Sequence, residues 1–98
     1  MSGEGVYILE LDRPLGNERH SARYYVGWTR NLEGRLHYHE RGLGAAFTRA
    51  AVQQGIGWKV ALFIPGAGRD VERAIKNSKN TKRWIDAYQR RQAKGGKQ

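Results

Sequence analysis

The chain has 98 residues, of which 39% are hydrophobic and 28% are charged, a composition typical of one small folded domain. It contains no cysteine, which excludes disulfide bonds and thiolate metal sites. Neither a signal peptide nor an apolar stretch long enough to cross a membrane is recognisable. We therefore expect a soluble, intracellular, cytoplasmic protein that has no membrane partner.

Basic residues outnumber acidic residues two to one. Eighteen Lys and Arg against nine Asp and Glu give a formal net charge of +9, which favours a polyanionic partner such as nucleic acid. The excess is concentrated in residues 76–97, where eight basic residues accompany one acid, Asp86. A solvated helix face followed by a polar tail explains the same pattern. We expect a single domain over residues 1–92 and a flexible basic tail over residues 93–98.

Two strands are expected first along the chain. Residues 5–11 and 22–28 are rich in β-branched and aromatic side chains, which is typical of strands. Residues 12–20 include Pro14 and Gly16 and are expected to form a connecting loop. A connection of this length favours an antiparallel hairpin.

Two helices and a third strand are expected next. Asn31 offers a side-chain cap for a helix that Gly42 ends. Residues 45–54 are a second short helix candidate, which ends at Gly55. Residues 58–64 are apolar and predict a third strand, closed by a segment rich in proline and glycine.

Two further helices complete the pattern. Val71 and Ile75 are spaced four residues apart, which indicates a helix, and Asn80 or Thr81 is a candidate cap for a last helix. The order β-β-α-α-β-α-α predicts an α+β domain in which helices flank a small three-stranded antiparallel sheet. The order of the strands within the sheet is not predicted by this pattern.

Two tyrosines in the first two strands are placed to face the same way. Side chains alternate along a strand, so Tyr7 and Tyr25 share one surface if their apolar neighbours face the core. Those neighbours are Val6, Ile8 and Val26. A single tyrosine in a strand is more often a packing residue, so the pair gains meaning only from the residues that follow.

Three charged or polar side chains follow on the predicted helices. Arg35 and His39 are four residues apart and point the same way from one helix, and Glu72 lies next to the apolar Val71. One pocket then collects two phenols, a guanidinium, an imidazole and a carboxylate. Singly, each is more often a solvated charge or a helix ion pair. The functional interpretation depends on their joint occurrence in this order.

The same residues resemble the motifs of the GIY-YIG nucleases. The triplets at residues 5–7 (GVY) and 25–27 (YVG) are similar to the two that name the family. The residues similar to its arginine, histidine and metal-binding glutamate are Arg35, His39 and Glu72. Residues 42–49 (GLGAAFTR) are similar to a segment of its small single-domain bacterial branch. The resemblance covers residues 5–84 and implies the fold of a GIY-YIG nuclease domain.

The resemblance also implies a metal-dependent endonuclease that hydrolyses phosphodiester bonds of DNA. Its catalytic residues are then Tyr7, Tyr25, Arg35, His39 and Glu72. Tyr7 is the general base, helped by His39, and Tyr25 positions the water or phosphate, although the two tyrosine roles are interchangeable at this stage. Nearby cations are expected to lower the pKa of the base from its usual value of about 10. Arg35 binds phosphate through its forked guanidinium, and Glu72 with water ligands suits Mg²⁺, with Mn²⁺ as a substitute.

Further DNA contacts are predicted at Arg49, Lys76, Asn77, Lys79, Lys82 and Arg83. Either Asn77 or Asn80 is available to hold the phosphate. Because the chain has no recognisable reading domain, we expect selectivity for single-stranded or branched DNA, as in DNA repair or recombination, or a protein partner that supplies specificity. Two alternatives remain: a basic nucleic-acid-binding module that cuts poorly, and a nuclease subunit active only with a partner. They differ over Glu72, which the enzyme needs and a pure binding module does not.

Overall fold

The computed structural model describes residues 3–15 and 23–95, with side chains as far as Arg91. Within these residues the chain forms β1 (Gly5–Leu11), β2 (Tyr24–Thr29), α1 (Leu32–Glu40), α2 (Ala46–Gln53), β3 (Trp58–Pro65), α3 (Arg69–Ser78) and α4 (Thr81–Gly95). The predicted order of strands and helices in an α+β domain is therefore confirmed. Most of the loop predicted over residues 12–20 lies outside the described residues.

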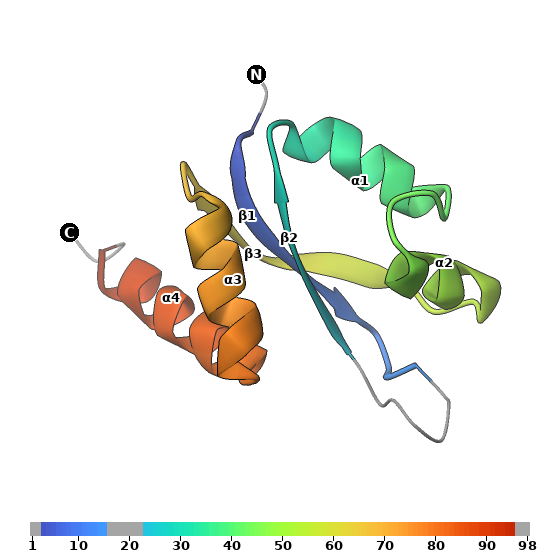
Figure 1. Cartoon of the computed structure of the whole chain (residues 1–98). Helices are drawn as coiled ribbons and strands as arrows, with labels where there is room; N and C mark the ends of the chain where they lie inside the picture. Colours follow the sequence, from blue (N-terminus) through green and yellow to red (C-terminus); the bar gives the residue numbers. More distant parts are fainter. Residues whose placement is uncertain (1–2, 16–22, 96–98) are drawn as a thin grey trace.

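The central strand of the sheet is β1. The three strands are antiparallel and lie in the order β2-β1-β3, so the predicted hairpin between the first two strands is confirmed. In the register, Tyr7 of β1 lies opposite Gly27 of β2 and Phe63 of β3. Figure 1 shows α1 and α2 on one side of the sheet and α3 and α4 on the other. β1 is buried along almost its whole length, because helices cover both faces of the sheet. A strand in this position is apolar on both faces.

Alternate side chains of β1 enter two separate layers of the fold. The layer under α3 and α4 contains Val6, Ile8, Val26, Leu62, Ile75 and Ile85, which confirms the predicted facing of the first three. The opposite layer, under α1 and α2, receives Tyr7 and Leu9, and both are 0% exposed. Tyr7 and Tyr25 share this face as expected, with ring centroids 6.1 Å apart, but Tyr7 is fully covered on it. Two helices cover this face, since its apolar residues, Leu9 among them, must also be removed from water.

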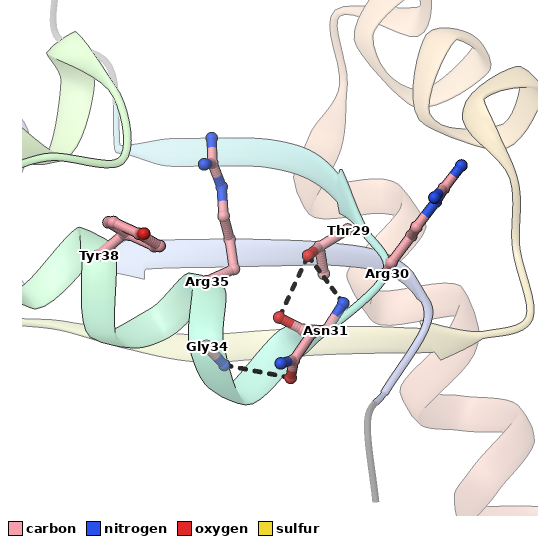
Figure 2. Close-up of a pocket in the computed structure, with 6 residues that line it drawn as sticks. All are labelled: Thr29, Arg30, Asn31, Gly34, Arg35 and Tyr38. Carbon is pink, nitrogen blue, oxygen red and sulfur yellow. Dashed lines mark hydrogen bonds between the residues drawn. The ribbon is translucent and has the colours of Figure 1, made fainter.

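Helix α1 is fixed at both ends. Asn31 Oδ1 accepts a hydrogen bond from the Gly34 amide at 3.2 Å, and Thr29 Oγ1 accepts one from the Asn31 amide at 3.0 Å (Figure 2). The predicted Asn31 cap is confirmed, and such a cap is worth about 1 kcal/mol. Gly42 follows the helix with φ of 74°, a left-handed conformation that glycine adopts at little cost. These two ends set how α1 lies over the sheet.

The last two helices form the other layer. Asn80 Oδ1 accepts a hydrogen bond from the Arg83 amide at 3.4 Å, so Asn80 rather than Thr81 caps α4. The helix then continues to Gly95, into the tail predicted over residues 93–98, because alanine and lysine favour helix. No helix in the described ranges is long and apolar enough to span a membrane.

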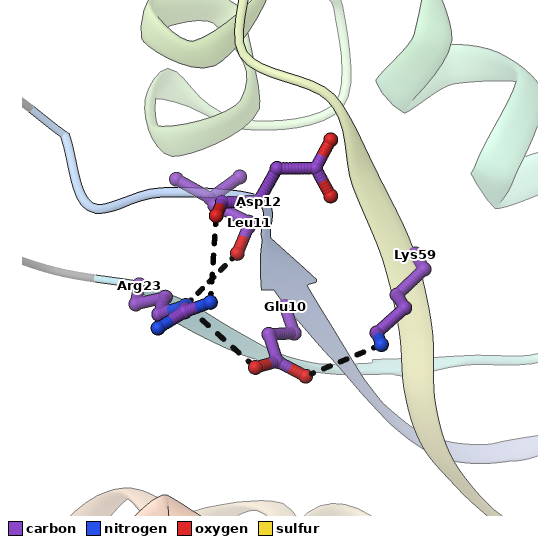
Figure 3. Close-up of polar contacts among 5 residues, drawn as sticks. All are labelled: Glu10, Leu11, Asp12, Arg23 and Lys59. Carbon is purple, nitrogen blue, oxygen red and sulfur yellow. Dashed lines mark hydrogen bonds and ion pairs between the residues drawn. The ribbon is translucent and has the colours of Figure 1, made fainter.

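Near the C-terminal end of β1, one carboxylate pairs with two cations, one from the segment that enters β2 and one from β3. Glu10 lies 3.6 Å from Arg23 Nε and 4.0 Å from Lys59 Nζ (Figure 3). Arg23 also donates to the backbone oxygens of Leu11 at 3.0 Å and Asp12 at 3.4 Å. Such partly exposed ion pairs add little stability.

Candidate active site

A series of buried hydrogen bonds runs from the sheet into α1 and α2. The Tyr7 hydroxyl lies 2.7 Å from His39 Nε2, and His39 Nδ1 lies 2.8 Å from Thr48 Oγ1. The Thr48 hydroxyl donates in turn to the Ala45 carbonyl oxygen at 3.2 Å. Tyr7, His39 and Thr48 are each 0% exposed, so their polar atoms depend on one another for hydrogen bonds. Sequence reasoning predicted the first two residues and assigned no role to Thr48.

Burial keeps both ends of the Tyr7–His39 hydrogen bond neutral. Burial lowers the pKa of His39 to about 4, and the nearby Arg35 guanidinium acts in the same direction. Burial raises the pKa of Tyr7 to about 12, although Arg35 opposes that rise. Arg35 acts in the expected direction, but desolvation outweighs it, so the pKa of Tyr7 is raised overall. At neutral pH a phenol faces a neutral imidazole.

Two glycines allow the Tyr7 and His39 side chains to meet. A Cβ atom on Gly27, opposite Tyr7 in the register, would lie 2.6 Å from the Tyr7 hydroxyl oxygen. A Cβ atom on Gly44 would collide with His39 Nδ1. Both glycines belong to segments that the sequence analysis matched to family motifs, but only the structure explains them. Since Tyr7 lies over Gly27, its hydroxyl is directed toward the open edge strand β2.

Tyr25 and Arg35 complete the cluster. The Tyr25 ring centroid lies 6.1 Å from that of Tyr7 and 5.4 Å from that of His39, and the ring stacks on Phe47 at 5.7 Å. The Arg35 guanidinium donates a hydrogen bond to the Gly44 carbonyl oxygen at 2.9 Å. Both side chains are partly buried, so they lie between the buried pair and solvent. Four of the five predicted catalytic residues are thus brought together.

Two adjoining pockets open beside Arg35 along α1. One is lined by Thr29, Arg30, Asn31, Gly34, Arg35 and Tyr38 (Figure 2). The other is lined by Gly34, His37, Tyr38 and Arg41. Tyr38 belongs to both pockets and is 56% exposed, which is unusual for a large aromatic side chain that has only a packing role. Arg30 and Arg35 extend the same way in Figure 2, so the first pocket is lined by two cations.

Glu72 comes from the other layer of the fold. It belongs to α3, which packs against β2 from the other layer. Its carboxylate forms an ion pair with Lys76 Nζ at 3.2 Å. The helix that carries Glu72 therefore lies on the other face of the sheet from α1 and α2 (Figure 1). The assignment of Glu72 as a catalytic residue stays a prediction.

The surroundings of Glu72 decide which kind of divalent metal site it could form. In residues 3–15 and 23–95 there is no group of three or more His, Cys, Asp or Glu side chains that could hold a metal ion. Mg²⁺ is commonly bound by one or two carboxylates together with water and substrate phosphate oxygens. A single partly buried carboxylate therefore fits a hydrated Mg²⁺ or Mn²⁺ ion and does not fit a site made of protein ligands alone.

The predicted DNA-contact residues lie in both layers. Arg49, on α2, donates through Nε to the Gly42 carbonyl oxygen at 3.4 Å. The other five belong to α3, the connection after it and α4, and all are exposed: Lys76, Asn77, Lys79, Lys82 and Arg83. Lys76 is paired with Glu72. No contact in the structure tests these six assignments, which stay predictions.

Residues 4–92 match the family described as the GIY-YIG catalytic domain. The match extends from before β1 into the last turn of α4, and it includes both triplets and the Arg35, His39 and Glu72 positions. The chain therefore belongs to the GIY-YIG family, a class of endonucleases that hydrolyse phosphodiester bonds. No curated protein and no solved structure matched the chain in the corresponding comparisons.

Proposed function

We propose that the chain is a divalent-metal-dependent endonuclease that cuts DNA, with a preference for single-stranded or branched structures. The observation that carries this proposal is the 2.7 Å hydrogen bond between Tyr7 and His39 Nε2 next to Arg35. It places a phenol within hydrogen-bond distance of an imidazole, beside a cation suited to phosphate. Hydrolysis of a phosphodiester needs both features, since water must lose a proton while negative charge grows on the phosphoryl oxygens.

Tyr7 acts as the general base in concert with His39. The Tyr7 oxygen takes a proton from the attacking water while its own proton passes to His39 Nε2. The water oxygen forms a bond to phosphorus, the bond between phosphorus and the leaving oxygen breaks, and that oxygen takes a proton from solvent. The pKa of Tyr7 is about 12 and that of His39 is about 4. These values disfavour a Tyr7 phenolate beside a His39 imidazolium as a separate intermediate, so the two proton transfers occur together. His39 afterwards returns its proton to solvent.

Arg35 and Tyr25 bind and orient the phosphate. A guanidinium carries five N–H donors, and the hydrogen bond to Gly44 orients Arg35 while leaving donors for two phosphate oxygens. Tyr25 is held by its stacking on Phe47 and is more exposed than Tyr7. This arrangement favours Tyr7 as the base and Tyr25 as the group that positions water or phosphate. Catalytic hydrogen bonds commonly tighten only once the substrate is bound.

A divalent metal would be held by Glu72, with water and a substrate phosphate oxygen as its other ligands. When bound, Mg²⁺ or Mn²⁺ offsets negative charge on the phosphoryl and leaving oxygens. Lys76 is 51% exposed, so it can turn away from Glu72 into water. Its ammonium is then free to contact a neighbouring DNA phosphate.

The preference for single-stranded or branched DNA is supported by the open pockets along α1. Exposed aromatic side chains next to cations stack unpaired bases while the cations follow the backbone. Tyr38, between Arg35 and Arg41 on α1, has these properties. Selectivity beyond this class of substrate would come from loops or from a protein partner.

A nicking assay tests the proposed activity. Wild type, Tyr7→Phe and Glu72→Gln are incubated with single-stranded, branched and duplex DNA in Mg²⁺, Mn²⁺ or EDTA. We expect cleavage in either metal and none in EDTA, and a loss of about 10²- to 10⁴-fold in Tyr7→Phe because the base is removed. Glu72→Gln should lose metal-dependent cleavage, whereas Asp70→Asn, an exposed acid in the same helix turn, should retain it.

Each outcome separates the possible functions. Cleavage that persists in Glu72→Gln would refute the metal site. Wild type that binds DNA but cuts none of the substrates would favour the binding module. Cleavage that appears only after a cell extract is added would favour a nuclease subunit that needs a partner.

A further inference from the structure

Thr48 is buried in α2 and forms hydrogen bonds with two residues. Its hydroxyl oxygen lies 2.8 Å from His39 Nδ1 and 3.2 Å from the Ala45 carbonyl oxygen. The side chain is 0% exposed, so these protein groups satisfy it. We propose that Thr48 is a positioning residue that fixes the tautomer of His39 so that Nε2 can accept the Tyr7 proton. This inference rests on the proposed function.

The direction of each hydrogen bond follows from the chemistry of the groups. A carbonyl oxygen only accepts, so the hydroxyl proton of Thr48 is directed to Ala45. The Thr48 oxygen must then accept from His39, which places the imidazole proton on Nδ1. A neutral imidazole carries one N–H, so Nε2 has a free lone pair, and the hydrogen bond at 2.7 Å is donated by the Tyr7 hydroxyl.

The opposite tautomer would leave the base unable to work. With its proton on Nε2, His39 would donate to Tyr7 and could not receive the phenolic proton. The hydrogen bond that one ring nitrogen makes sets the protonation of the other, so the partner of Nδ1 decides whether Tyr7 can act as a base. After the proton transfer, Thr48 also stabilises the imidazolium, because its oxygen still accepts from Nδ1.

Other groups around the His39 ring cannot replace Thr48. The titratable or charged side chains that face it are Tyr7 from β1, Tyr25 from β2 and Arg35 from α1. Trp58 from β3 makes an edge contact with the ring. In the described part of the chain, Nδ1 has a hydrogen bond only with Thr48, and Gly44, packed against this nitrogen, offers no side chain.

The tautomer can be measured without any enzymatic assay. In wild type labelled with ¹⁵N on histidine, the two ring nitrogens of His39 are distinguished by their chemical shifts and their couplings to ring protons at pH 7.5. We expect a protonated Nδ1 and an unprotonated Nε2. Thr48→Val has nearly the same shape but no hydroxyl, and should show a mixed or reversed population. Thr48→Ser restores the hydroxyl and should restore the wild-type pattern.

Cleavage kinetics then test the catalytic consequence. Thr48→Val should lower kcat about 10- to 100-fold, the size of loss seen when metal-binding histidines lose the partner that orients them, with little change in KM because Arg35 is untouched. Thr48→Ser should retain most of the activity. Thr81→Val, a threonine at the start of α4 away from the site, controls for the substitution itself, and thermal unfolding verifies that each variant folds.

Several results would overturn the inference. A wild-type His39 protonated at Nε2 contradicts the assigned tautomer directly and needs no variant. A Thr48→Val enzyme as active as wild type contradicts the positioning role while leaving the proposed nuclease function intact. A folded wild type that cuts none of the DNA substrates removes the proposed function and the catalytic role of Thr48 with it, whereas the NMR measurement still identifies the tautomer.

Discussion

At the scale of single residues, the buried His39 ring links the stability of the fold to pH. The ring titrates near pH 6.5 when it is exposed in the unfolded chain, whereas burial lowers its pKa to about 4 in the fold. Between these values the unfolded chain binds more protons, so stability falls as the pH is lowered. Between pH 7.5 and pH 5 we expect His39 to account for a loss of about 2 kcal/mol in the free energy of unfolding, measured by urea denaturation.

The variant His39→Gln isolates this effect. Any other group that changes its protonation in this range contributes equally to both proteins. The variant should therefore be less stable than wild type at pH 7.5, and the difference should shrink by about 2 kcal/mol at pH 5. The same pH dependence in both proteins would show that His39 accepts a proton in the fold without cost.

The sequence predicted which residues form the site more fully than it predicted their surroundings. Tyr7, Arg35 and His39 could be found from their spacing and from alternation along a strand. The full burial of Tyr7 could not, because alternation distinguishes two faces of a sheet without showing what covers each one. The rise in its pKa was not predicted for the same reason, because burial outweighs the expected effect of Arg35. Thr48 stood in a recognised segment, but its contact with His39 joins residues on two helices that no sequence period relates.

At the scale of secondary-structure elements, caps and breakers were predictable and packing was not. Asn31 marks the start of α1 and Gly42 follows its end, as expected, because both residues act on adjacent backbone atoms. The strand order β2-β1-β3 was not predicted, because antiparallel pairing of β1 with β3 depends on contacts far apart in the chain. The same holds for α3, which carries Glu72 and packs against the other face of the sheet (Figure 1).

Helix α1 is predicted to contribute a base-stacking position beside the phosphate site. Tyr38 is 56% exposed between two pockets that share it. Removing one stacked base costs about 1–3 kcal/mol, so Tyr38→Ala should weaken binding of single-stranded DNA about 5- to 150-fold. Fluorescence anisotropy with a labelled single strand and the inactive Tyr7→Phe background measures this without cleavage.

Leu43→Ala is the matched control for Tyr38→Ala. Leu43 lies just after α1, is 60% exposed and is apolar without being aromatic, so its removal should leave single-strand binding unchanged. Duplex binding should be nearly the same in all three proteins, because paired bases are not available to stack on a side chain. An equal loss with both variants, or with duplex, would show that Tyr38 contributes general surface and not a stacking position.

At the scale of the whole molecule, positive charge lies in both layers on either side of β2. Arg30, Arg35 and Arg41 line the pockets near α1, whereas exposed cations on α3 and α4 accompany Glu72. The net charge of +9 is therefore not confined to one side of the sheet. A DNA strand that contacts both Arg35 and the exposed cations of α3 and α4 would therefore reach both layers.

The salt dependence of binding tests whether the α4 cations contact DNA. Each protein cation that neutralises a phosphate releases counterions, so the logarithm of the binding constant falls with the logarithm of salt concentration. The double variant Lys82→Gln, Arg83→Gln removes two positive charges from α4. It should reduce this slope by about 0.9 for each duplex phosphate that the protein no longer neutralises. Lys59→Gln should leave it unchanged, because Lys59 lies on the other edge strand and is paired with Glu10. A slope in the double variant equal to that of wild type would show that Lys82 and Arg83 contact no phosphate of the bound DNA. The charge on α4 would then be a solvated helix face.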